Sequence, residues 1–116
     1  MTENKHAVEA YIDGFRRTDR AQILSNLTDD VEWEIPGAFH LRGKDEFAQH
    51  IVSPGFVPNP EITVTRLTEE NEVVVAEGTV RTARTDGVVM TLAFCDVFEM
   101  RGGKIRRLVS YLMETR

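Results

Sequence analysis

Residues 88–100 read VVMTLAFCDVFEM, and their side chains alternate between two chemically different sets. Because successive side chains of a strand point to opposite faces of a sheet, this alternation predicts a long β-strand. One face is large and apolar apart from one carboxyl group: Met90, Leu92, Phe94, Asp96, Phe98 and Met100. The other face has smaller side chains: Val89, Thr91, Ala93, Cys95, Val97 and Glu99. We therefore expect helices to cover the first face.

The alternation continues in neighbouring runs, over residues 62–67, 73–84 and 104–114. Asp86-Gly87 suits a tight type I′ turn between two of these runs, because both residue types tolerate positive φ. Gly102-Gly103 suits the same turn before the last run. The second half of the chain is therefore expected to form consecutive hairpins. In residues 73–84 the pattern leaves open which face is inward.

The start of the chain shows helical spacing instead. Residues 2–18 place apolar side chains at i, i+3, i+4 and i+7, which is one face of a helix that Thr2 or Asn4 can cap. These side chains are Val8, Tyr11, Ile12 and Phe15. A shorter helix is expected over residues 20–27, with Asp19 as its N-cap.

A short strand is expected at residues 31–35, where apolar side chains alternate with glutamates until Pro36-Gly37. Residues 38–41 are expected to form a loop, and a third helix begins after Gly43. Helices early in the chain and strands later are typical of an α+β domain, with helices packed on one face of the sheet.

The composition bounds the class of protein. The 116 residues suffice for one domain, residues 1–116, and 14 basic against 19 acidic side chains give a net charge of −5, unlike a nucleic-acid binder. No apolar run is long enough to span a membrane, and the first residues do not resemble a secretion signal. The one cysteine, Cys95, excludes an internal disulfide. We expect a cytoplasmic protein without nucleic-acid or membrane partners.

Asp96 and Tyr11 are the polar groups that the pattern places on apolar faces. An ionised carboxylate between Phe94 and Phe98 costs several kcal/mol unless it is paired, so Asp96 finds a partner or stays neutral. It is a candidate functional group or, alternatively, a core residue bonded to a hydroxyl or an arginine. Tyr11 is a second candidate or a core tyrosine. The three histidines show no metal-ligand spacing, and no nucleotide-binding or serine-hydrolase motif is present.

Three segments resemble the SnoaL-like branch of the nuclear-transport-factor-2-like superfamily, which also includes the ketosteroid isomerases. They are residues 8–11 (VEAY), 27–37 (LTDDVEWEIPG) and 96–105 (DVFEMRGGKI). The resemblance implies a cone-shaped fold, in which three N-terminal helices pack on a strongly curved sheet and enclose an apolar pocket. It also implies a homodimer through the outer sheet face, where Val89, Thr91, Ala93, Cys95 and Val97 would form an apolar patch.

The resemblance also assigns site positions. In the ketosteroid isomerases a tyrosine and a protonated aspartic acid form the oxyanion hole, and these positions fall on Tyr11 and Asp96. The position of the isomerase base falls on Ile35, which cannot take a proton. The acid–base set of the related limonene-epoxide hydrolases falls on Glu77, Thr79 and Ser110.

These positions predict a small-molecule pocket protein that acts on, or binds, a small hydrophobic carbonyl compound by acid–base chemistry, as isomerases or cyclases do. Asp96 and Tyr11 would donate hydrogen bonds, His40 or Glu77 would assist, and no metal or organic cofactor is needed. The expected pocket residues are Phe15, Trp33, Ile35, Glu77, Thr79, Phe94, Phe98, Leu108 and Ser110. Because the base position is Ile35, a non-catalytic binder of an apolar ligand and a structural dimer stay open as alternatives.

Overall fold

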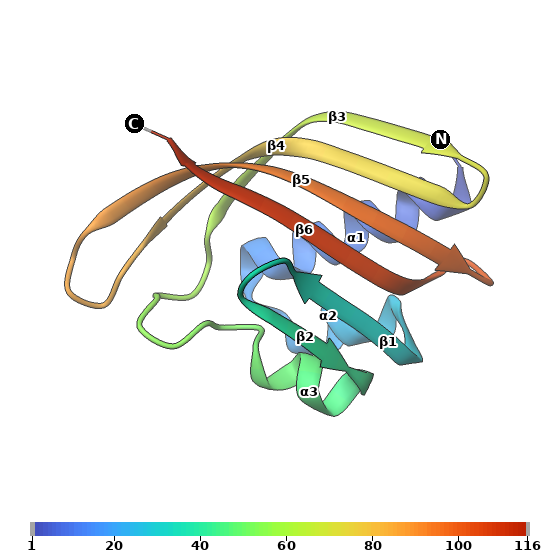
Figure 1. Ribbon diagram of the computed structural model, residues 1–116, viewed down its shortest axis with the longest axis horizontal. Helices are drawn as coiled ribbons and strands as arrows, with labels where there is room; N and C mark the ends of the chain where they lie inside the picture. Colours follow the sequence, from blue (N-terminus) through green and yellow to red (C-terminus); the bar gives the residue numbers. More distant parts are fainter. Residues whose placement is uncertain (1, 116) are drawn as a thin grey trace.

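One curved sheet and three helices form the two layers of the molecule in the computed structural model, which describes residues 2–115 (Figure 1). The helices are α1 (Glu3–Arg17), α2 (Arg20–Ser25) and α3 (Gly43–Gln49). The strands are β1 (Leu27–Ile35), β2 (Phe39–Arg42), β3 (Glu61–Glu70), β4 (Val73–Ala83), β5 (Val89–Arg101) and β6 (Lys104–Thr115). The predicted α+β class, with N-terminal helices on a curved sheet, is confirmed.

The sheet has six strands in the order β2-β1-β6-β5-β4-β3, and it does not close into a barrel (Figure 1). Only the β1–β6 pair is parallel; the other neighbouring pairs are antiparallel. The β3–β4 register shifts between Val64 and Arg66, and the β5–β6 register shifts between Glu99 and Met100. Such bulges bend and twist a sheet, so they contribute to its curvature.

The core lies between α1 and the inner face of the sheet. Val8 of α1 and Phe98 of β5 are fully buried, and Tyr11 packs edge-on against Phe98 with ring centroids 5.5 Å apart. The large face of β5 is therefore the covered one, as its alternation predicts. Thr2 caps α1 and Asp19 caps α2, through side chains that accept hydrogen bonds from backbone N–H groups.

Residues 39–42 form strand β2, so the prediction of a loop at residues 38–41 is wrong. Gly37, with φ of 83°, reverses the chain, and the Ala38 N–H donates to the Ile35 carbonyl at 2.9 Å. Phe39 then pairs with Ile35 in an antiparallel ladder. The tight turn lets a strand follow where Pro36-Gly37 alone suggested an end of regular structure.

The turns of the last two hairpins differ. Gly102 and Gly103 both have positive φ, 59° and 76°, as a type I′ turn requires. In the β4–β5 connection only Gly87 has positive φ, and the Arg84 N–H donates to the Val88 carbonyl at 2.8 Å. The hairpin is therefore as predicted, but its loop has one residue more than the expected type I′ turn, with Gly87 in the left-handed position.

None of the described helices has both the length and the apolar character needed to cross a membrane.

Candidate functional site

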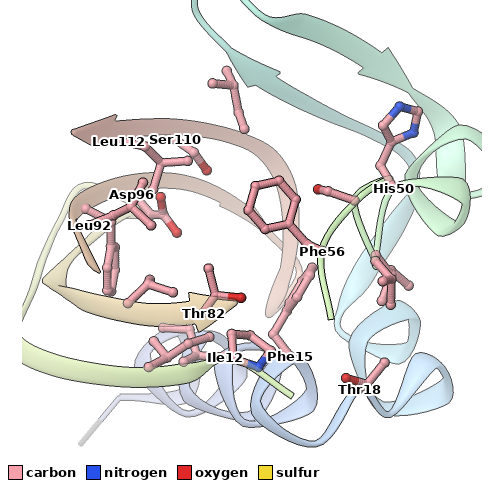
Figure 2. A pocket seen from close by; sticks show the side chains of 18 of the residues that line it. Ile12, Phe15, Thr18, His50, Phe56, Thr82, Leu92, Asp96, Ser110 and Leu112 are labelled. Atoms are coloured by element: carbon pink, nitrogen blue, oxygen red, sulfur yellow. The ribbon is translucent and has the colours of Figure 1, made fainter. Parts of the chain in front are cut away.

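A cavity of about 310 Å³ lies between α1, the inner face of the sheet and the segment of residues 50–60 (Figure 2). Its volume is at the lower end of the range for small-molecule sites. Most of its lining is apolar, with Ile12 from α1, Leu92 from β5 and Phe56 from the segment 50–60 as examples. Several of the residues expected from the sequence line it: Tyr11, Phe15, Trp33, Ile35, Phe94, Asp96 and Ser110.

Asp96 supplies the carboxyl group of this cavity. Its Oδ1 atom is buried and has no hydrogen-bond partner among residues 2–115. Burial raises the pKa of Asp96 from its ordinary value of 3.8 to about 7, against the opposing effect of a hydrogen bond from Ser110. Because Asp96 lines the cavity, its carboxyl group is placed beside any ligand that binds there.

Ser110 lies beside Asp96, because the two residues are directly opposite each other on β5 and β6 (Figure 2). The buried Trp33 Nε1–H donates to Ser110 Oγ at 3.1 Å. A hydroxyl has one donor hydrogen, so Ser110 accepts from Trp33 and keeps that hydrogen for Asp96.

Tyr11 is another hydroxyl-bearing residue of the cavity lining. Its side chain is 3% exposed and packs edge-on against Phe15, Phe47 and Phe98. Burial, and then the nearby charge of Asp96, raise the pKa of Tyr11 well above its ordinary value. The hydroxyl therefore keeps its proton and can donate it in a hydrogen bond.

Glu77 and Thr79, expected in the pocket, lie on the outer face of β4, so this expectation is wrong. Val80 and Thr82 line the cavity, and residues at odd spacing from them point the other way. Glu77 instead makes an ion pair with Arg66, with 3.5 Å between Oε1 and Nε. The cavity thus lacks the acid–base set of the limonene-epoxide hydrolases.

His40 is also on the outer face and does not line the cavity. It lies opposite Glu34 in the β1–β2 ladder, and its Nε2 is 2.9 Å from Glu32 Oε1. Phe98 and Leu108, both fully buried, are core residues beside the cavity and are not part of its lining. The expectation that these three side chains take part in the pocket is therefore corrected.

The sequence interpretation did not include His50 and the segment that follows it among the site residues. His50, Phe56 and Val57 line the cavity, although proline spacing had indicated only a loop there. The Val57 N–H donates to the Ala83 carbonyl at 2.9 Å, and the Thr85 N–H donates to the Gly55 carbonyl at 2.8 Å. These long-range contacts had no local signal in the sequence. Met90 and Leu92, which also line the cavity, could have been found, because they share the large face of β5 with Asp96.

Within residues 2–115, no group of three His, Cys, Asp or Glu side chains is arranged to hold a metal ion.

Comparisons with known proteins agree with this architecture. A family model described as a SnoaL-like domain matches residues 8–108. No curated protein matches the chain in sequence.

Three similar solved structures cover nearly the whole chain. An NTF2-like protein of unknown function from Burkholderia pseudomallei is 24% identical, with a TM-score of 0.88 over 97% of this chain and 92% of that one. TerC, co-crystallised with polyporic acid, is 26% identical, with a TM-score of 0.85 over 94% of this chain and 90% of that one. An LEH-like epoxide hydrolase from M. tuberculosis is 23% identical, with a TM-score of 0.84 over 96% of this chain and 83% of that one.

Proposed function

This chain belongs to the SnoaL-like domain family, and we propose that it binds a small apolar carbonyl compound in its cavity and acts on it by acid–base chemistry. The observation that carries the proposal is Asp96, a buried carboxyl group with one unpartnered oxygen in a mostly apolar cavity. The similarity to TerC, which was co-crystallised with polyporic acid, supports an organic ligand.

The proposed role of Asp96 follows from its protonation. With a pKa of about 7, the carboxyl is largely neutral below neutral pH and can donate a hydrogen bond to a carbonyl oxygen. Tyr11 would donate a second hydrogen bond to the same oxygen. If a water molecule takes a proton from the carbon next to the carbonyl, negative charge develops on the carbonyl oxygen, and fixed hydrogen-bond donors in the site stabilise it.

Binding of 2-acetylnaphthalene, an apolar aromatic ketone, tests the role of Asp96. We expect Asp96→Ala to weaken binding about tenfold, because it removes a donor worth about 1.4 kcal/mol. Asp96→Asn keeps a donor of similar shape and should bind nearly as well as the wild type. Glu77→Ala is the matched control, since it removes a carboxylate from the outer face and should leave binding unchanged. Equal binding by wild type and Asp96→Ala would refute the proposal.

A non-catalytic binder is the second candidate, and Ile35 favours it. Ile35 lines the cavity at the position where the isomerases, by resemblance, carry their base. The two candidates differ in the exchange of the ketone's methyl protons with D₂O, followed by NMR. If the wild type accelerates this exchange and Asp96→Ala does not, the protein is an enzyme. Tight binding without accelerated exchange indicates a binder.

A further inference from the structure

His50 is a polar group of the cavity that is distant from Asp96 both in sequence and in the structure. It is the C-cap residue of α3, and Figure 2 shows it on the other side of the cavity from Asp96 and Ser110. The side chain is only partly exposed, and its ring is tilted against Phe39 with centroids 5.3 Å apart. The ring is therefore held in place by packing.

The hydrogen bond of His50 fixes which ring nitrogen can accept. Nδ1 lies 3.2 Å from the backbone carbonyl oxygen of Glu46, which can only accept a hydrogen bond. Nδ1 must therefore carry a hydrogen, and in the neutral ring the lone pair is on Nε2. No hydrogen-bond partner of Nε2 is found within the described part of the chain, residues 2–115.

We propose that His50 is a ligand-binding residue whose Nε2 accepts a hydrogen bond from a hydroxyl group of the bound compound. This rests on the proposed function, in which the carbonyl group of the ligand is bound at Asp96. The ligand class is then narrower: an apolar carbonyl compound with a hydroxyl group at the end remote from the carbonyl. The cavity walls between Asp96 and His50 are apolar and suit a flat hydrocarbon body. They include Phe15, Leu92 and Phe56.

Two probes that differ in one hydroxyl group test this inference. 6-Acetyl-2-naphthol carries a hydroxyl at the far end of its ring system, and 2-acetylnaphthalene lacks it. We expect the wild-type protein to bind the naphthol about five- to tenfold more tightly by titration calorimetry, as one added hydrogen bond allows. His50→Phe keeps a ring to pack on Phe39 but has no acceptor, so it should bind both probes equally. His50→Gln has an acceptor and should recover part of the preference.

The matched control is His40→Phe, which makes the same change on the outer face and should keep the wild-type preference. Asp96→Ala separates the role of Asp96 from the role of His50. It should weaken the binding of both probes to the same extent and leave the preference for the hydroxyl-bearing probe intact. If Asp96→Ala does not weaken the binding of either probe, the proposed function fails. If wild type shows no preference, or His50→Phe keeps it, the role of His50 is overturned.

Discussion

Asp96 shows how a single side chain acquires its chemistry from its neighbours. The alternation of residues 88–100 was sufficient to place a carboxyl group between Phe94 and Phe98 on the covered face. Its partner Ser110, and Trp33 behind it, come from strands that are distant in sequence. The pairing of β6 with β1 brings them together, and no local pattern encodes that pairing. The burial of Asp96 could thus be predicted from the sequence, whereas its polar neighbours Ser110 and Trp33 could not.

The raised pKa of Asp96 predicts how stability depends on pH. The folded protein holds the Asp96 proton more tightly than the unfolded chain does. Protonated Asp96 therefore adds to the free energy of unfolding; this addition is complete below about pH 4 and is lost as the pH rises through about 7. A pKa difference of about three between the folded and unfolded states corresponds to a loss of up to about 4 kcal/mol in the free energy of unfolding. We expect urea unfolding to show lower stability at about pH 8 than at about pH 5, with a smaller decrease in Asp96→Asn.

Glu77→Gln is the control for this experiment, because it neutralises a carboxylate on the outer face and should keep the wild-type pH profile. Asp30, whose pKa is lowered to about 2 mainly by its hydrogen bond with Arg101, titrates below this window and does not interfere. Parallel profiles of wild type and Asp96→Asn would contradict the prediction.

At the scale of elements, β4 was the strand whose faces the sequence could not assign. Its outer residues include Val75 and Thr79, and its inner residues include Ala76 and Gly78, so neither face is clearly more apolar. Gly78 is needed on the inner face because neighbouring groups approach closely at this position. A Cβ atom at Gly78 would overlap the Thr63 carbonyl oxygen, next to the bulge of β3, and would lie 2.9 Å from Phe94 Cε1.

Gly78→Ala is therefore expected to destabilise the protein by about 2–3 kcal/mol, since the added methyl group meets backbone and a packed ring. Thr79→Ala, one residue along on the outer face, is the matched control and should cost less than about 1 kcal/mol. Urea unfolding measures both. A Gly78→Ala protein as stable as the wild type would show that β3 can move away from β4 without cost.

The segment of residues 50–60 shows a different limit of sequence reading. Its prolines correctly indicate a loop, but its place over the cavity depends on contacts with residues far along the chain. Its Asn59 N–H donates to Thr18 Oγ1 at 2.8 Å, and Phe56 forms an isolated bridge with Arg84. Neither contact leaves a periodic signal in the sequence. The sequence therefore does not reveal that His50 and Phe56 line the cavity.

For the whole molecule, the order of helices and strands was predictable because local patterns define it. Amphipathic spacing, N-caps and alternation gave α1, α2 and the long strands β3 to β6 with nearly their observed bounds. The parallel pairing of β1 with β6 and the short strand β2 were not predictable from local patterns, because both depend on where the chain returns. The curvature of the sheet was predicted from the family resemblance, and the β-bulges give its physical basis.

The outer face of the sheet carries an apolar surface that one copy of the chain leaves uncovered. Cys95 is opposite Tyr111 and Ala93 is opposite Met113, so these side chains share that face. Tyr111 and Met113 are 53% and 71% exposed. We propose, as the sequence suggested, that two copies associate through this face, because a contiguous apolar patch is stabilised when it is removed from water.

Sedimentation velocity at micromolar concentration tests this association. The wild type should sediment as a dimer, and Met113→Glu should shift it to a monomer, because a carboxylate on each copy would lose its hydration when the interface forms. Gln49→Glu adds the same charge on the exposed surface of α3, away from the sheet face, and should remain dimeric. Because the cavity is on the opposite side of the sheet from this patch, the Met113→Glu monomer should still bind 2-acetylnaphthalene. A monomeric wild type would contradict the association without affecting the assignment of the cavity.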